Sequence, residues 1–96
     1  MTTYDLQFLP SALTEWRTLD ASIRRQFKTK LQQRLRHPQG PGSRLRSMPD
    51  CYKIKLASAG YRLVYRVNAT AFTVLVIAVG KRENLDTYRK AQTRIQ

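Results

Sequence analysis

A β-hairpin in the middle of the chain is the feature that most constrains the fold. Residues Cys51–Leu56 alternate apolar and basic side chains, and Tyr61–Asn68 alternate in the same way. The four residues between these segments end on Gly60, which can adopt a positive φ in a tight connection. Simple hairpin pairing sets Leu56 opposite Tyr61, and this register brings the lysines of one strand and the arginines of the other to one face.

This predicted basic face carries charges of a single sign. In the same register Lys55 lies opposite Arg62 and Lys53 lies opposite Val64, and neither strand contains a carboxylate. Like charges opposite each other destabilise a sheet, so the cluster indicates a polyanionic partner. The alternative is a solvated outer face, which is the usual environment of charged strand residues.

The overall charge supports the first interpretation. The 96 residues contain 18 Lys and Arg against 6 Asp and Glu, a net charge of +12, which favours nucleic acid or an acidic protein as partner. We expect no membrane association, because no helix pairs a Lys/Arg-rich face with an uninterrupted apolar one and the apolar run Val74–Val79 is too short to span a bilayer. The N-terminus lacks signal-peptide features and Cys51 is the only cysteine, so we expect a cytoplasmic protein.

The remaining segments complete a single domain over residues 1–96. The patterns predict a strand at Tyr4–Leu9, a helix from Pro10 to about Thr18, a longer helix capped by Asp20, a buried strand at Phe72–Val79 and a last helix after Asn84. The longer helix has one apolar stripe, formed by Ile23, Phe27, Leu31 and Leu35. The order β-α-α-β-β-β-α predicts a small α+β fold, a twisted antiparallel sheet with helices packed mainly on one face.

The open face of that sheet would be a basic groove. It would hold Lys53, Lys55, Arg62 and Arg66, with Lys81, Arg82 and Tyr88 at its rim, an arrangement suited to a single-stranded backbone and a stacked base. Tyr88 also has helical spacing with Ala91 and Ile95, so a place in the core is the alternative. The basic flank of the longer helix is either a phosphate-binding surface or a solvated one.

Such a groove could cleave RNA, with the 2′-hydroxyl as the nucleophile. The reaction needs a base, an acid and cations around the phosphorane, but the one histidine, His37, stands beside Pro38 at a helix end, and we expect Glu83 to pair locally. Neighbouring cations disfavour protonation of a lysine, so a lysine could act as the base. Chemistry of this kind is weak unless a partner orients the RNA. The scattered carboxylates predict neither a metal site nor a cofactor.

Three segments in this order and spacing carry a family resemblance. Leu45–Leu56, Gly60–Tyr65 and Val79–Glu83 closely resemble the RelE toxins of bacterial toxin–antitoxin modules, and the likeness extends to Glu15-Trp16-Arg17 and to Tyr88. It covers nearly the whole chain. The resemblance implies a type II toxin, a ribosome-dependent and metal-independent endoribonuclease (an mRNA interferase) that inhibits translation by cutting mRNA in the A site of the 30S subunit through 2′-hydroxyl attack.

The same resemblance implies roles for individual residues. Lys55 matches the family's general base, and Lys53 matches the lysine that supports it. Arg62 matches the arginine that steadies the scissile phosphate, and Arg82 matches the one that acts electrostatically at the leaving group. Tyr88 matches the tyrosine that stacks on or orients the substrate. Arg46 matches a further phosphate-contacting residue, and Arg44, Arg66 and Lys81 are additional RNA-binding candidates. The implied partners are mRNA, the ribosome with its rRNA, and a RelB-type antitoxin with which the toxin represses its own operon.

Two other functions remain as alternatives. A non-catalytic basic module could hold RNA or an acidic partner in the same groove. A gyrase-inhibiting toxin of the same superfamily would share the fold, but such toxins generally lack the clustered Lys53, Lys55, Arg62 and Arg82, whose presence here favours the nuclease.

Overall fold

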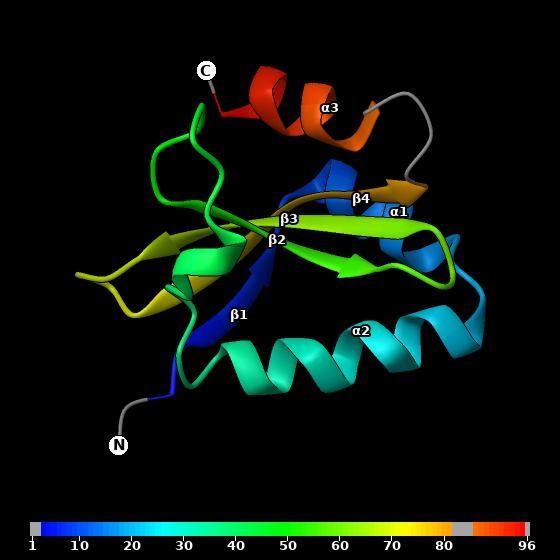
Figure 1. Ribbon diagram of the computed structural model, residues 1–96, viewed down its shortest axis with the longest axis horizontal. Helices are drawn as coiled ribbons and strands as arrows, with labels where there is room; N and C mark the ends of the chain where they lie inside the picture. The colour runs from blue at the N-terminus through cyan, green and yellow to red at the C-terminus, as the bar shows by residue number, and fades with distance from the viewer. Residues whose placement is uncertain (1–2, 82–85, 96) are drawn as a thin grey trace.

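The computed structural model describes residues 3–81 and 86–95 and confirms the predicted α+β fold and order of elements. Within these residues a four-stranded sheet lies between two layers of helices, with α2 on one side and α3 on the other (Figure 1). The elements are β1 (Asp5–Phe8), α1 (Pro10–Arg17), α2 (Ala21–Arg34), a short 3-10 helix η1 (Pro41–Ser43), β2 (Cys51–Leu56), β3 (Tyr61–Asn68), β4 (Thr73–Lys81) and α3 (Asp86–Arg94).

The hairpin has the predicted register. Leu56 pairs with Tyr61, Lys55 with Arg62, and Lys53 with Val64. Gly60 adopts a φ of 72°, a conformation that residues with a Cβ rarely take. The strand order is β1-β4-β3-β2, so the apolar segment predicted to be buried, β4, is a central strand.

The direction of β1 differs from the prediction. β1 pairs in parallel with β4, with Leu6 beside Val74, so the sheet is mixed and the expectation of a wholly antiparallel sheet was wrong for this strand. The alternation of side chains is the same in parallel and antiparallel strands. Strand direction is set instead by the path of the chain through α1, α2 and the hairpin, which local patterns do not reveal.

The larger hydrophobic core lies between the sheet and the first two helices. The stripe of α2 faces the sheet as predicted, with Ile23, Phe27 and Leu31 buried and Leu35 partly buried against them. Asp20 occupies the N-cap position of α2, but its side chain makes no capping hydrogen bond. No helix among the described residues is long and apolar enough to cross a membrane.

A smaller core lies on the opposite face, beneath α3. It contains Met48, Cys51, Val64, Ile77, Ala78 and Ala91. The register of β4 shifts at Val64/Tyr65, and this irregularity places the consecutive residues Ile77 and Ala78 in the same cluster. Two of the three helices therefore pack on one face, and α3 covers part of the face predicted to be open.

Two arginines of the basic flank of α2 have structural contacts. Arg34 donates hydrogen bonds to the Lys53 carbonyl (3.2 Å) and to the hydroxyl of Tyr65 (3.0 Å), which in turn donates to the Pro38 carbonyl (2.7 Å). Arg24 donates to the carbonyls at the end of α1 and just beyond it. Each of these two side chains therefore has a structural role through its Nη1 atom.

Candidate active site

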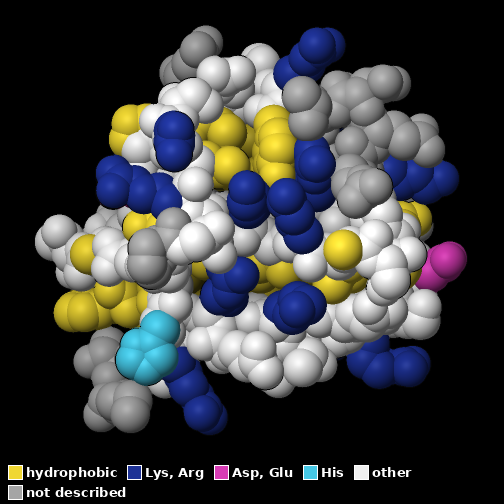
Figure 2. All heavy atoms as spheres, viewed as in Figure 1, with side chains coloured by type: hydrophobic (Ala, Val, Ile, Leu, Met, Phe, Trp, Pro, Cys, Tyr) yellow, Lys and Arg dark blue, Asp and Glu magenta, His cyan; other side chains and the backbone are white. Residues whose placement is uncertain are grey.

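The hairpin register builds the core of the candidate site. Lys53 and Lys55 on β2 and Arg62 and Arg66 on β3 share the face that also carries α3. Lys55 and Arg66 are exposed, whereas Lys53 and Arg62 are half-buried. Directly paired residues have Cβ atoms about 5 Å apart, so Lys55 and Arg62 can contact one phosphate together. Figure 2 shows Lys and Arg side chains gathered across the middle of one side of the molecule, where an acidic side chain is visible only at the margin.

Arg62 and Tyr88 form the most specific contact of the site. The guanidinium carbon of Arg62 lies 4.7 Å from the centroid of the Tyr88 ring, within the range of a cation–π interaction. The Nε and Nη1 atoms of Arg62 and the hydroxyl of Tyr88 are buried, and they have no hydrogen-bond partner in the described part of the chain. Buried donors without partners cost free energy, and an anion such as a phosphate oxygen is one kind of partner that would satisfy them.

The protonation of Tyr88 suits a hydrogen-bond donor. Burial raises the pKa of the Tyr88 hydroxyl, and the charge of Arg62 offsets only part of this increase. The phenol is therefore protonated at neutral pH. Tyr88 and Ile95 also pack, partly buried, against the smaller core, so the alternative placement of Tyr88 in the core is confirmed, whereas its role at the substrate stays a prediction.

One predicted residue, Lys81, is not brought into this cluster. Lys81 pairs with Tyr61, so its side chain lies on the face of α1, away from Arg62. It is exposed and lines a shallow pocket with Glu15 and Lys90. The expectation that Lys81 lies at the rim of the same groove is therefore wrong. Arg82 and Glu83 lie outside the described residues.

The loop before β2 presents the two other predicted arginines. Leu45 packs against the smaller core, and its N–H donates to the Cys51 carbonyl (3.0 Å), so the loop is attached to the sheet. Arg44 and Arg46 are exposed on either side of this anchor, and Arg44 also forms an isolated backbone bridge with Tyr52. Both guanidinium groups can reach solvent or a bound polyanion.

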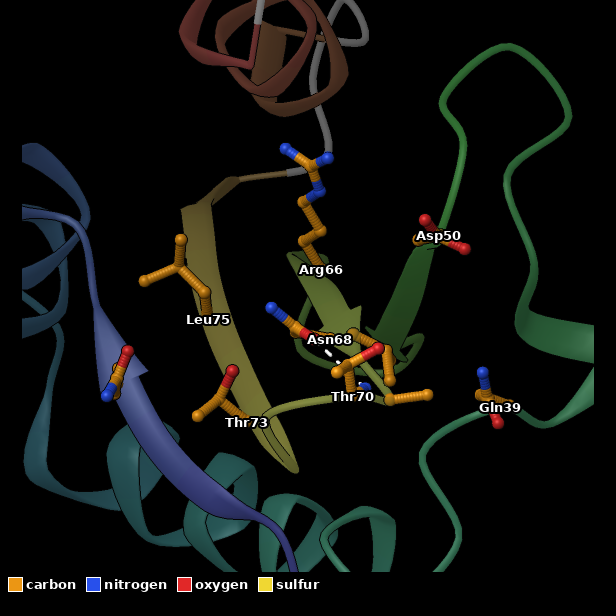
Figure 3. A pocket seen from close by; sticks show the side chains of 10 residues that line it. Gln39, Asp50, Arg66, Asn68, Thr70, Thr73 and Leu75 are labelled. Atoms are coloured by element: carbon orange, nitrogen blue, oxygen red, sulfur yellow. Dashed lines mark hydrogen bonds between the residues drawn. The ribbon is translucent and has the colours of Figure 1, made fainter.

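Arg66 lies at the other end of β3, beside a polar pocket that the sequence did not reveal. The pocket has a volume of about 620 Å³, and its lining includes Gln39, Asp50, Asn68 and Thr73. Figure 3 shows that Arg66 projects from β3 toward α3, while Asp50 and Gln39 come from the loop that faces it. Arg66 is four residues from Arg62, or about 13 Å along an extended strand, so it occupies a separate position along the face from Lys55.

Sequence reasoning also missed an ion pair that fastens α3. Arg94 donates from Nη1 to Oε1 of Glu15 (2.9 Å) and from Nη2 to Oε2 (3.0 Å). Burial alone would raise the pKa of Glu15, but hydrogen bonds from Arg94 and Val79 and the charge of Arg94 hold it below its usual value of 4.5. These partners are more than sixty positions apart from Glu15 in the chain, and no local pattern indicates such a contact.

Among the described residues there is no group of three or more His, Cys, Asp or Glu side chains that could hold a metal ion. His37 is exposed beyond the end of α2. The described cluster thus offers lysine and arginine, with one phenol, as its chemical groups. It can bind a phosphate, stabilise negative charge and accept a proton only through a lysine.

Comparisons of this chain with known proteins all indicate toxins of type II toxin–antitoxin systems. A model of the family described as "ParE toxin of type II toxin-antitoxin system, parDE" matches residues 6–85. The mRNA interferase toxin RelE of Escherichia coli K12 is 51% identical over 92 residues, which cover 96% of this chain and 97% of that protein. The mRNA interferase RelE of Shigella flexneri is similar to the same extent.

Solved structures give the same result. A variant of the Escherichia coli toxin RelE in the free state matches with a TM-score of 0.91 and 49% identity, over 98% of this chain and 99% of that one. The toxin in the intact Escherichia coli RelBE toxin–antitoxin complex matches with a TM-score of 0.81 and 52% identity, over 84% of this chain and 99% of that one.

Proposed function

This chain belongs to the family of type II toxin–antitoxin toxins that includes RelE and ParE, and from this premise we propose that it cuts mRNA in the ribosomal A site without a metal ion. The chain is an endoribonuclease toxin that cleaves mRNA, and its partner is a RelB-type antitoxin. The proposal concerns where it cuts, which residues do the chemistry and what presents the substrate.

The observation that carries the proposed site is the contact between Arg62 and Tyr88. Two buried guanidinium nitrogens and one buried hydroxyl lie together without partners among the described residues, one strand away from Lys55. A scissile phosphate seated on Arg62 would satisfy these donors. Arg62 would then stabilise the negative charge that develops on the phosphorane oxygens, since fixed donors in a buried site act strongly on such charge.

The proton transfers follow from the placement of the lysines. Lys55 removes the proton of the 2′-hydroxyl, and the 2′-oxygen attacks the adjacent phosphorus while the bond to the 5′-oxygen breaks. Lys53, half-buried on the same face, adds positive charge, and Arg82 is assigned to the leaving 5′-oxygen by its position in the family pattern. The leaving 5′-oxygen takes up a proton from solvent, so the products are a 2′,3′-cyclic phosphate and a 5′-hydroxyl, and no water is consumed in the cleavage step.

Dependence on the ribosome follows from how weak this machinery is alone. The described cluster has no histidine or carboxylate for acid–base catalysis, and a lysine is a poor base at neutral pH. Holding the 2′-oxygen, phosphorus and 5′-oxygen in line can supply several kcal/mol of the barrier. We assign this alignment to the A site. Because translated mRNA is the substrate, the proposed compartment is the cytoplasm.

The remaining basic residues would bind RNA without taking part in bond breaking. Arg44 and Arg46 on the loop and Arg66 at the far end of β3 are exposed on or near the same face. Each would contribute one phosphate contact and a corresponding salt dependence. Lys81 would contact RNA only from the opposite side of the sheet.

The test compares ribosomes programmed with a defined A-site codon and the same mRNA free in solution. We expect the protein to cut only the ribosome-bound mRNA, and Lys55→Ala to reduce the rate by about 10²–10⁴-fold through loss of the base while the variant still binds ribosomes. Arg17→Ala, which removes an equal charge from the exposed end of α1, is the control and should cut normally.

Each other outcome identifies a different function. Equal cutting of free mRNA would contradict the assigned role of the ribosome. Ribosome binding without cutting would indicate a basic binding module. Inhibition of gyrase with no cutting would indicate the gyrase-inhibiting toxin that the sequence left as an alternative.

A further inference from the structure

The helix that carries Tyr88 has little apolar surface to hold it in place. α3 has nine residues, and of those described Thr87 and Ala91 are buried, while Tyr88 and Ile95 pack around Ala91. Helices shorter than about 12 residues are marginal in water and depend on packing against the rest of the protein. Burial of one alanine and parts of two larger side chains is a weak attachment, so polar contacts must contribute to the position of α3.

The strongest of these contacts joins α3 to α1. Arg94 holds the carboxylate of Glu15 through two hydrogen bonds of 2.9 and 3.0 Å, and its Nη1 also donates to the Ile77 carbonyl (2.8 Å). Both side chains are about four-fifths buried, with 20% and 19% of their surface exposed. Forked arginine–carboxylate pairs are both strong and directional, so this contact fixes the orientation of α3 as well as its distance.

Glu15 is itself fixed by the sheet. Its Oε1 accepts a hydrogen bond from the Val79 N–H (3.2 Å), so one carboxylate ties α1, β4 and α3 together. Lys90 adds a longer contact to Oε2 (3.3 Å), but its side chain is 47% exposed, and exposed pairs contribute little.

The other end of α3 is positioned by close packing on β4. A Cβ on Gly80 would lie 3.1 Å from Thr87 Oγ1, and this oxygen donates to the Lys81 carbonyl (3.3 Å). Gly80 is the residue that pairs with Arg62 in the sheet. Tyr88 follows directly after this contact and precedes Arg94 by six residues, so it lies between two points that fix the helix.

We propose that Glu15 and Arg94 are positioning residues for the nuclease, holding α3 so that the Tyr88 ring stays against the Arg62 guanidinium. Neither side chain touches the reacting atoms. The ion pair joins α3 to α1. By holding α3 in place, it maintains the contact between Tyr88 and Arg62 on which the proposed phosphate site depends. The catalytic part of this inference rests on the function proposed above, whereas the structural part does not.

The structural part can be tested in the free protein by titrating Tyr88. With tyrosine labelled at Cζ, carbon NMR follows each phenol, and Tyr88→Phe assigns the signal. In the wild type the pKa of Tyr88 lies above its ordinary value of 10.0, mainly because of burial. Arg94→Met should return it toward 10.0, and Arg94→Lys, which keeps the charge but not the fork, should have an intermediate effect.

The catalytic part is tested on programmed ribosomes with the same variants. Arg94→Met and Glu15→Gln should lower kcat by about 10- to 100-fold, the range expected when a reacting group is slightly misplaced, while KM changes little. Because the two residues form one contact, the double variant should be no worse than the poorer single variant.

Arg24→Met is the matched control. It removes an equal charge and a half-buried arginine that also binds carbonyl groups, but at the junction of α1 and α2, away from α3. It should lower stability and leave both kcat and the Tyr88 titration unchanged. An unchanged Tyr88 titration and kcat in Arg94→Met would overturn the inference. If the wild type cuts nothing, the proposed function fails, and the titration still decides whether Glu15 and Arg94 position Tyr88.

Discussion

Arg62 is the residue on which the proposed chemistry depends most. Its burial over the Tyr88 ring leaves Nε and Nη1 without a partner among the described residues, which is a cost that an apolar residue would avoid. Arg66, two pairs further along the same face of β3, is exposed and lies beside the polar pocket instead. Two arginines with the same charge on one strand should therefore behave differently.

We predict that Arg62→Lys lowers kcat by about 10²–10³-fold on programmed ribosomes. Lysine keeps the charge but cannot present two fixed N–H groups, so the phosphorane loses directed hydrogen bonds. Arg66→Lys, the matched change, should keep kcat. Single-turnover rates at saturating protein measure the difference, and equal rates for the two variants would show that charge alone explains the site.

Neighbouring residues show why the sequence predicted this cluster. The strict alternation in β2 and β3 and the turn at Gly60 set the register, and the register alone places Lys55 beside Arg62. The contact between Arg62 and Tyr88 is different, because it depends on where α3 docks. The sequence indicated both residues, but their distance required the tertiary structure.

At the scale of elements, the placement of α3 could not be predicted for the same reason. It depends on Glu15, Ile77 and Arg94, which come from three separate elements. The parallel pairing of β1 is a second case, since it follows from the path of the chain rather than from its pattern. Local periodicity thus predicted which elements form, whereas contacts distant in sequence determine how α3 and β1 are arranged.

The ion pair at Glu15 gives α3 a specific pH dependence. The pKa of Glu15 is lower in the folded protein than its ordinary value of 4.5, so above that value the folded state gains stability from the ionised carboxylate. This gain is lost as the pH falls below 4.5 and through the folded pKa. The groups facing Glu15 from the packed elements, Arg94, Lys90 and the Val79 N–H, all favour its charged form.

We predict that Glu15→Gln unfolds at a lower urea concentration than the wild type at pH 7 and that this difference shrinks steadily as the pH falls below 4.5. The other carboxylates titrate in both proteins, so their effects cancel in the difference between the wild type and Glu15→Gln. The pH dependence of this difference therefore reports on Glu15 alone. A difference that stayed constant with pH would mean that the carboxylate charge does not contribute to the attachment of α3.

At the scale of the whole molecule, part of the net charge of +12 is gathered in one place. The hairpin face carries Lys53, Lys55, Arg62 and Arg66, and the loop before it carries Arg44 and Arg46. Figure 2 shows basic side chains across the middle of one side of the molecule. Composition alone predicted a polyanionic partner. The fold shows which of the described charges lie together. Lys81 lies on the opposite side of the sheet from the hairpin face. Arg24 and Arg34 donate hydrogen bonds to backbone carbonyls.

The central claim is that this face cuts mRNA by making its own 2′-hydroxyl the nucleophile. The most direct measurement is cleavage of A-site codons in which each nucleotide in turn carries a 2′-deoxyribose, with analysis of the product ends. The account predicts that one deoxy substitution, on the 5′ side of the cut, abolishes cleavage, and that the wild-type products end in a 2′,3′-cyclic phosphate and a 5′-hydroxyl. Cleavage of every deoxy codon, with a 5′-phosphate on the product, would mean that water attacks the phosphate and would contradict the mechanism.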